Sequence, residues 1–261
     1  MHTPRFIRRA LLQTVFCRRM PLGDSGPVVS FAFDDFPRSA YTVAGSILKD
    51  AGARGTYYVA PGLLNACNSV GEYCTLDDLY SLVADGHELA THTFHHVSCH
   101  GTPASTYLQE VRRGRDAMRE HAELKVSDNF AFPFGAVSPA SKRMVGREML
   151  SCRGNFHGIN GPEVDLNLLR ANALYGDMTG LPMVRSLISA NERTRGWLIF
   201  YTHDLGTNPS PHGCTPDFFQ SVVKLVCDKA MKILTVDEVI ANCMGAREAV
   251  VTAKMTPESV A

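Results

Sequence analysis

The 261-residue sequence lacks an excess of charge of either sign, because its 26 lysines and arginines balance its 26 aspartates and glutamates. This balance argues against a broad basic surface, so we expect no nucleic-acid partner. The sequence also lacks any apolar run near the roughly 20 residues that cross a bilayer, so we expect no membrane span. A hydrophobic fraction of 45% excludes a disordered chain.

Metal-binding cysteine pairs are missing as well. None of the eight cysteines forms a CxxC pair, which leaves a thiolate zinc site without support. Their number is typical of a reduced intracellular protein and not of a disulfide scaffold. Cys67 and Cys74 are near enough in the sequence to form a bridge or to remain free thiols, and both alternatives stay open.

The N-terminal segment lacks the features of a signal peptide. Its apolar stretch is short, is interrupted by Gln13 and is followed by Arg18 and Arg19 with no small-residue cleavage site. This pattern favours an amphipathic surface helix, and we expect a cytoplasmic protein. We divide the chain into an N-terminal extension (1–27), one domain (28–245) and a C-terminal tail that we expect to be disordered (246–261).

Short apolar runs alternate with helical patterns through the domain. The predicted strands are residues 28–33, 56–59, 88–91, 129–132, 197–202 and 232–234. Helix-start signals occur at Thr75, Thr102-Pro103, Ser138-Pro139, Thr215-Pro216 and Thr235, and the pattern is blurred between Cys152 and Met183. About seven strand–helix repeats predict an α/β fold, an irregular (β/α) barrel of about seven parallel strands. A doubly wound open sheet is the alternative, although no phosphate-binding glycine motif follows any strand.

Short motifs follow four of the predicted strands, and three of these motifs contain polar residues that can bind metal. The motifs are Asp34-Asp35, His92 to His96, Pro133-Phe134-Gly135 and His203-Asp204. In α/β folds the carboxyl ends of the strands form one rim, where the active site lies. The sequence therefore predicts that four distant segments converge on one site.

The spacing of His92 and His96 indicates a metal site. Residues four apart on a helical turn share a face, so both imidazoles can reach one ion. A carboxylate from a neighbouring strand would complete a two-histidine, one-aspartate set, which binds zinc and leaves positions open for water and substrate. The same set suits non-haem iron, so the spacing does not decide the metal. One aspartate of the Asp34-Asp35 pair can bind the ion while the other faces the water.

The order FAFDD, HTFHH, FPFG and FYTHD resembles the polysaccharide deacetylase family, also called the NodB-homology group or carbohydrate esterase family four. The resemblance runs from about Val28 to Ile240. It implies a distorted TIM-type barrel and metal-dependent removal of N- or O-acetyl groups from sugars, commonly N-acetylglucosamine units.

The resemblance also implies a role for each motif residue. Asp34 corresponds to the catalytic base, and His203 to the general acid. The backbone N–H of Phe134 supports the oxyanion, with Pro133 beside it in the substrate site. The implied metal ligands are Asp35, His92 and His96, and Thr93 is expected to orient their loop. The implied cofactor is one divalent ion, first of all zinc, with cobalt, nickel, manganese or iron as alternatives.

Three positions depart from the family pattern. Ala131 stands where many members have an arginine, Phe36 where many have a glycine, and Tyr201 where many have an aliphatic residue that lines the acetyl pocket. The arginine that braces the base is therefore unassigned, with Arg153 and Arg170 as candidates. Tyr201 is a predicted substrate-binding residue.

These residues predict a metal-dependent hydrolase that removes a small acyl group from an amino sugar in a glycan or its precursor. Lipopolysaccharide or oligosaccharide biosynthesis is the setting that the resemblance favours. The alternatives are an amidohydrolase for a small non-sugar amide and a catalytically silent sugar-binding module. Among the other histidines, we expect His87, which precedes a predicted strand, to be structural. The sequence does not indicate the oligomeric state.

Overall fold

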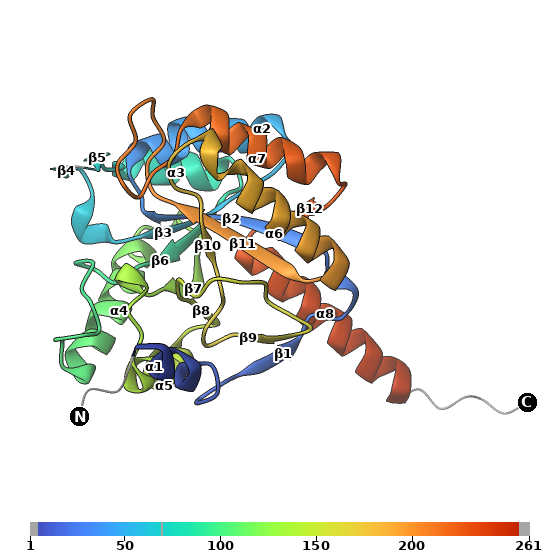
Figure 1. Ribbon diagram of the computed structural model, residues 1–261. Helices are drawn as coiled ribbons and strands as arrows, with labels where there is room; N and C mark the ends of the chain where they lie inside the picture. Colours follow the sequence, from blue (N-terminus) through green and yellow to red (C-terminus); the bar gives the residue numbers. More distant parts are fainter. Residues whose placement is uncertain (1–4, 69, 256–261) are drawn as a thin grey trace, which may run out of the picture.

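A curved sheet of parallel strands forms the centre of the computed structural model, which describes residues 5–68 and 70–255 (Figure 1). Seven strands lie in the order β10-β11-β2-β3-β6-β7-β8, and β12 (Lys232–Ile233) pairs with the start of β2. The seven strands are β2 (Val28–Asp35), β3 (Thr56–Val59), β6 (Glu88–Thr91), β7 (Val126–Ala131), β8 (Ser151–Arg153), β10 (Asn172–Ala173) and β11 (Trp197–Thr202). The predicted α/β fold with about seven parallel strands is confirmed as a half-barrel.

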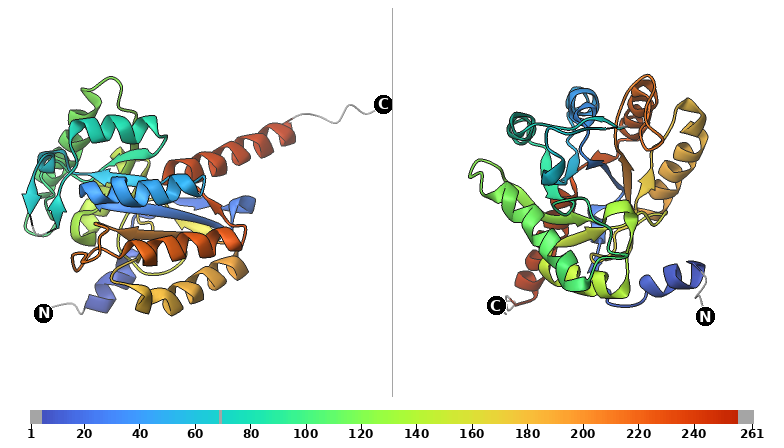
Figure 2. Two further views of the ribbon diagram at one scale, coloured as in Figure 1. Left: turned by 90° about the horizontal axis from the view of Figure 1, so that it is seen from above. Right: turned by 90° about the vertical axis from the view of Figure 1, so that its left-hand side faces the viewer.

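Most of the helices lie on the outside of this sheet (Figure 2), whereas the last one packs into the inner core through Val236, Val239 and Ile240. The helices are α1 (Arg5–Leu12), α2 (Ser46–Asp50), α3 (Leu76–Ala84), α4 (Ala104–Arg119), α5 (Pro139–Glu148), α6 (Leu181–Thr194), α7 (Pro216–Asp228) and α8 (Val236–Met255). A π-helical turn, η2 (Ala40–Gly45), precedes α2, and short 3-10 turns lie at η1 (Gly23–Ser25), η3 (Pro61–Leu63), η4 (Pro133–Gly135) and η5 (Met178–Gly180). No helix in the described part of the chain is both long and apolar enough to cross a membrane.

Strand alternation separates two faces of the sheet. On β2, Phe31 and Phe33 join the outer core, where their rings lie 5.3 and 5.8 Å from the ring of Phe219 on α7. Ala32, between them, belongs to a second core on the inner face. Because successive side chains of a strand point to opposite faces, Asp34 follows Ala32 on the inner face, at the carboxyl end of β2.

A buried polar cluster closes the inner face near the beginning of the strands. Glu88 of β6 accepts hydrogen bonds from the hydroxyls of Thr56 (2.8 Å) and Ser127 (2.7 Å) and from the amide of Asn129 (2.7 Å). It also accepts the backbone N–H of Asp237 in the first turn of α8, at 2.9 Å. Burial raises the pKa of Glu88, and these donors oppose that rise. The cluster therefore holds the start of α8 against the sheet.

The N-terminal segment packs along the flank of the domain. Its strand β1 (Arg19–Pro21) pairs antiparallel with β9 (Glu163–Asp165). The buried ammonium of Lys142 donates to the carbonyl of Leu12 at 2.6 Å and to the carboxylate of Asp165 at 2.7 Å. The first domain boundary, between residues 27 and 28, stays a prediction.

The C-terminal segment differs from the expectation. Residues 246–255, which we expected to be disordered, continue α8 as a helix as far as Met255. This correction has a local reason, since residues 246–255 contain no glycine or proline that would end a helix. Residues 256–261 of the expected tail lie outside the described residues.

Local start signals in the sequence are only partly realised. Thr75 and Ser138 form capping boxes with Asp78 and Ser141, as their spacing predicted. Helix α4 begins at Ala104, one residue later than expected, with Pro103 at the N-cap and no side-chain cap from Thr102. The blurred region contains β8, β9 and β10, which have only two or three residues and are too short to show a period. In the described chain Cys67 is an exposed free thiol and Cys74 a buried one.

His87 precedes β6 and has the structural place that we expected. Its Nδ1 atom accepts the backbone N–H of Gly55 at 3.0 Å, and its ring lies 5.3 Å from that of Tyr57. Because the site is buried, the pKa of His87 is lowered to about 4. As the pH is lowered, the folded protein therefore protonates His87 at a lower pH than the unfolded chain does.

We predict that His87 makes the protein less stable between pH 6.5 and pH 4. In this window the unfolded chain binds a proton that the folded protein does not bind, so the free energy of unfolding falls by about 3 kcal/mol as the pH is lowered. Urea unfolding of His87→Asn should show a shallower pH dependence than the wild type. His100→Gln, at an exposed histidine, is the control and should keep the wild-type slope. Equal slopes for His87→Asn and the wild type would contradict the prediction.

Candidate active site

The two adjacent aspartates at the end of β2 have separate partners. Asp34 accepts a short hydrogen bond from the guanidinium of Arg153, and both side chains are buried. Asp35 has a left-handed backbone, with φ of 62°, and its carboxylate lies against His92 and His96. The left-handed turn interrupts the strand alternation, which explains how neighbouring residues both reach the site.

The two histidines converge through a loop and not through a helical turn. Residues 92–96 follow β6 without helical structure, so the helical geometry that we used to interpret the spacing is wrong. Thr93 and His96 have φ of 63° and 54°, and the Thr93 hydroxyl accepts the N–H of Val97 at 3.1 Å, which confirms its role in the loop. Gly114 of α4 lies against this loop, where a Cβ would be 2.6 Å from the carbonyl carbon of Thr93.

Asp35, His92 and His96 present a donor set that fits a metal ion. The Nε2 atoms of His92 and His96 lie 3.3 and 2.9 Å from Oδ1 of Asp35, and the three ligand atoms lie within 4.8 Å of one another. That carboxylate oxygen is buried and has no hydrogen-bond donor in the described chain. Burial raises the pKa of Asp35, but the adjacent imidazoles of His92 and His96 outweigh burial and hold the pKa below its ordinary value. A buried oxygen facing two imidazole nitrogens suits a divalent cation.

A backbone contact selects the nitrogen of His92 that faces the site. Nδ1 of His92 lies 2.8 Å from the carbonyl oxygen of Ala131, which can only accept a hydrogen bond. Nδ1 therefore carries the proton, and Nε2 has its lone pair free for a metal ion. Such orientation by an outer partner is the usual arrangement at histidine metal sites.

His203 lies across the rim from the two histidines. Its Nδ1 is 3.1 Å from the carbonyl oxygen of His212, and its Nε2 is 4.0 Å from Oδ2 of Asp35. Burial lowers the pKa of His203, and the charges of Asp34 and Asp35 partly offset that effect. The carbonyl keeps Nδ1 protonated, so Nε2 is the atom that gains or loses a proton inside the site.

The loop that supplies this carbonyl is organised by Asp204. The buried carboxylate of Asp204 accepts the N–H of Ser210 at 2.8 Å and also the Ser210 hydroxyl. Its own carbonyl accepts the N–H of Cys214 at 3.0 Å. The sequence did not indicate the contact of His212 with His203 or the role of Asp204 in the loop, because no strand pattern or motif spacing marks residues 204–214.

Pro133 and Phe134 form a tight turn beside the metal ligands. Pro133 is buried, whereas Phe134 has φ of 60° and its side chain is 65% exposed. The Phe134 ring lies 4.4 Å from the ring of His96. The left-handed conformation is unusual for a bulky residue, and such strain commonly occurs at functional sites.

Phe36 occupies a backbone conformation that explains the family preference for glycine there. Its φ is 69°, which glycine adopts without steric cost. The phenylalanine side chain is fully buried, and its ring lies 4.9 Å from that of Tyr57. Burial of the ring offsets the backbone cost at this position.

Arg153 replaces the missing arginine of β7. Ala131 of β7 and Arg153 of β8 are register partners, so the guanidinium comes from the neighbouring strand at the same level. It lies between two phenol rings, 5.0 Å from the ring of Tyr58 and 4.9 Å from that of Tyr201. Burial lowers the pKa of Arg153, but Asp34 and the tyrosines outweigh burial and raise it. The sequence did not indicate the contact of Tyr58 with this arginine, although the alternation of side chains along β3 places Tyr58 on the inner face.

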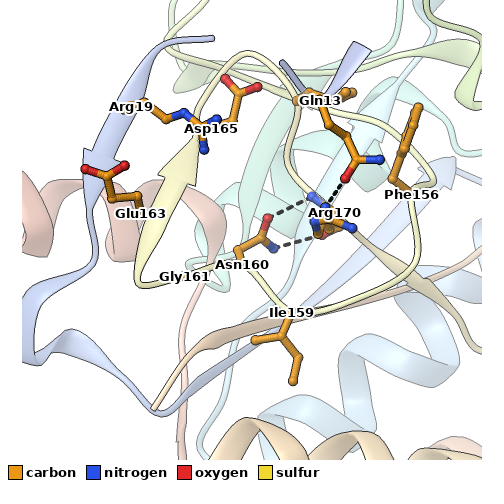
Figure 3. Close-up of a pocket in the computed structure, with 10 residues that line it drawn as sticks. Gln13, Arg19, Phe156, Ile159, Asn160, Gly161, Glu163, Asp165 and Arg170 are labelled. Atoms are coloured by element: carbon orange, nitrogen blue, oxygen red, sulfur yellow. Dashed lines mark hydrogen bonds between the residues drawn. The ribbon is translucent and has the colours of Figure 1, made fainter. Parts of the chain in front are cut away.

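Arg170, the other candidate, lies in a separate pocket. Its guanidinium donates to the side chain of Gln13 and to the carbonyl of His157, and Figure 3 shows it between Gln13 and Asn160. In the described chain no hydrogen bond joins Arg170 to Asp34. The pocket has a volume of about 280 Å³ and lies beneath the N-terminal segment.

We predict that Asp35→Ala, His92→Ala and His96→Ala each reduce metal content sharply, because each removes one of three ligands. Elemental analysis of purified protein after metal loading and dialysis should find about one ion per wild-type chain. His95→Ala is the matched control, since His95 lies in the same loop but pairs with Glu110 at 3.1 Å. Full metal retention by all three ligand variants would show that the site is placed wrongly.

We predict that Arg153→Met destabilises the protein by about 3–5 kcal/mol, the cost of leaving the buried Asp34 carboxylate without its partner. The exchanged pair Ala131→Arg with Arg153→Ala should recover part of this loss, because the guanidinium returns at the same level of the barrel. Urea unfolding measures both effects. If the double variant is no more stable than Arg153→Ala alone, an arginine at position 131 cannot replace the one at position 153.

Residues 23–148 match the family model described as polysaccharide deacetylase. None of the curated proteins matches the sequence.

Solved structures of low sequence identity share the fold. A mutant of the peptidoglycan deacetylase PdaC from Bacillus subtilis is 14% identical, with a TM-score of 0.54 over 90% of this chain and 99% of that one. The chitin deacetylase from Colletotrichum lindemuthianum is 16% identical, with a TM-score of 0.54 over 86% and 89%. A family 4 acetyl xylan esterase from Clostridium thermocellum is 15% identical, with a TM-score of 0.54 over 82% and 90%. Residues 23–148 of this chain thus match the polysaccharide deacetylase family, and the chain as a whole shares the fold of these deacetylases and this esterase.

Proposed function

We propose that this protein is a metal-dependent hydrolase that removes an N-acetyl or similar small acyl group from an amino sugar. The observation that carries the proposal is the meeting of Asp34, Asp35, His92, His96 and His203 at one end of the sheet, from three strand ends. A catalytically silent sugar-binding module would not need this assembly. Residence in the cytoplasm and a role in lipopolysaccharide biosynthesis stay predictions.

Asp35, His92 and His96 would hold one divalent ion, with zinc as the first candidate. The structure of the acetyl xylan esterase from Clostridium thermocellum is described as a complex with a cobalt ion, which supports the proposal of a metal ion in this chain. When bound, the ion would lower the pKa of a water molecule and polarise the acyl carbonyl.

Asp34 is the proposed general base. Its hydrogen bond from Arg153 fixes the orientation of the carboxylate, while the other carboxylate oxygen stays available to the attacking water. Since the carboxylate of Asp35 faces the two histidines, we assign metal binding to Asp35 and proton transfer to Asp34. Asp34 removes the water's proton as the new C–O bond forms.

Phe134 and His203 complete the proposed mechanism. The N–H of Phe134 would donate to the carbonyl oxygen as negative charge develops, and loss of one such donor commonly costs about 10²–10³ in turnover. His203 carries its mobile proton on Nε2, which faces the site, and delivers it to the leaving nitrogen. The amine then departs neutral, and the acid and a free amino sugar result.

The function is tested by mass spectrometry of acetylated amino sugars and their oligomers after incubation with metal-loaded protein. Loss of one acetyl mass in the wild type, and its absence with Asp34→Asn that retains its metal, would support the proposal. A set of small non-sugar amides in the same assay tests the alternative amidohydrolase. Turnover by Asp34→Asn at the wild-type rate would overturn the base assignment.

We predict that His203→Ala separates amide from ester hydrolysis. An amine cannot leave as an anion, so the variant should lose about 10²–10⁴ in turnover on an amide. An aryl acetate has a better leaving group, and its hydrolysis should fall much less. Metal content is measured in parallel, because a purely structural histidine would damage the metal site and reduce both reactions alike. Equal losses on both substrates would refute the acid role.

A further inference from the structure

The loop after β8 (residues 154–158) connects the proposed active site to the N-terminal segment. It lies at the carboxyl end of its strand, on the rim that carries the site. The side-chain amide of Asn155 donates to the carbonyl of Phe134 at 3.5 Å, and a Cβ on Gly135 would collide with the same side chain. Asn155 therefore packs against the turn to which the proposed mechanism, on which this inference rests, assigns the oxyanion.

Helix α1 places a guanidinium on the other side of this loop. Arg9 donates to the carbonyl of Asn155 at 3.4 Å, and its guanidinium carbon lies 4.5 Å from the centroid of the Phe156 ring. Burial raises the pKa of Tyr201 in the site, and the positive charge of Arg9 is among the influences that oppose this rise. Arg9 thus acts on the site from its rim.

A second guanidinium borders the same loop. Arg170 donates to the carbonyl of His157 at 3.1 Å and to the side chain of Gln13, as Figure 3 shows for Gln13. The amide of Gln13 in turn donates to the carbonyl of Arg9 at 3.3 Å. Phe156, which stacks on Arg9, also lines the pocket that contains Arg170. The two arginines therefore lie on one stretch of surface beside the rim.

No carboxylate neutralises these two arginines in the part of the chain that the structure describes. The guanidinium groups of Arg9 and Arg170 donate only to neutral carbonyl oxygens. Two acids line the other side of the pocket (Figure 3). Of these, Asp165 is paired with Lys142 at 2.7 Å, and Glu163 is exposed on β9. Positive charge is therefore in local excess beside the site, although the whole chain is neutral.

We propose that Arg9, together with Arg170, binds an anionic group of the substrate, a phosphate or a carboxylate on the acylated sugar or on the unit next to it. Guanidinium groups form strong, often paired hydrogen bonds with both kinds of anion. Arg9 precedes residues 23–148, the part of the chain that matches the family model. The anion site thus depends on the N-terminal segment and not on the motifs that carry the reaction.

The experiment compares N-acetylglucosamine, its 1-phosphate, its 6-phosphate and N-acetylmuramic acid as substrates of metal-loaded protein. Wild-type kcat/KM should be highest for a charged sugar, and the preferred one distinguishes a phosphate from a carboxylate. Arg9→Gln should raise KM for that sugar about tenfold and leave the neutral sugar unchanged, because a hydrogen bond to a charged group is lost. Arg9→Lys keeps the charge and should lose less.

Arg143→Gln is the matched control. Arg143 also stacks on a ring of the N-terminal segment, 5.4 Å from the centroid of Phe16, so its loss tests whether loosening that segment is enough to change selectivity. This variant should keep the wild-type preference. A wild type that prefers the neutral sugar, or an Arg9→Gln variant with an unchanged ratio of charged to neutral kcat/KM, would overturn the proposal.

A second measurement separates this inference from the proposed function. Binding of glucosamine, its two phosphates and muramic acid is measured by calorimetry, because these free amino sugars carry no acyl group and undergo no turnover. Stronger binding of a charged sugar, lost in Arg9→Gln, supports the anion site. If no acetylated sugar is hydrolysed while this pattern holds, the proposed function is wrong and the anion site stands. Equal binding of charged and neutral sugars, or a preference that persists in Arg9→Gln, would refute the site.

Discussion

Two adjacent carboxylates buried at the end of one strand impose the main constraint on this protein. An uncompensated buried charge costs several kcal/mol, so each aspartate needs its own partner. Arg153 compensates Asp34 from β8, and His92 and His96 approach Asp35 from the loop after β6. The sheet must therefore curve enough to bring these strand ends together. The division between base and metal ligand follows from this division of partners.

The same convergence requires an unusual backbone. Asp35, Phe36, Thr93, His96 and Phe134 all have positive φ, and all lie in the turns that follow strands at the site. Each such residue costs on the order of 1 kcal/mol or more, which surrounding structure must offset. The burial of Phe36 against Tyr57 and the close packing of Gly114 on Thr93 are two of the contacts that do so.

The exchange between Ala131 and Arg153 shows how a family motif can change while its physical function persists. What Asp34 requires is a buried cation at one level of the barrel, and Arg153 provides it from the strand beside Ala131. The aromatic rings of Tyr58 and Tyr201 stack on the guanidinium and shield the ion pair from water.

The sequence alone determined which segments carry chemistry, because strand periodicity and strand-end motifs are local properties. It predicted the parallel α/β sheet, the four motif segments and the residues Asp34, Asp35, His92, His96 and His203 that the structure brings together. Their chemical roles remain proposals. Local pattern did not show the loop geometry of His92 to His96, the continuation of α8 or the short strands β8 to β10.

Only the tertiary structure decided between Arg153 and Arg170, because both lie in the region where the sequence pattern is blurred and shows neither which strand carries an arginine nor what lies across the barrel. It also identified His212 as the partner of His203, a contact between residues nine positions apart that depends on the path of a loop. Contacts of this kind arise from strand order and curvature, which are properties of the assembled sheet and not of any segment within it.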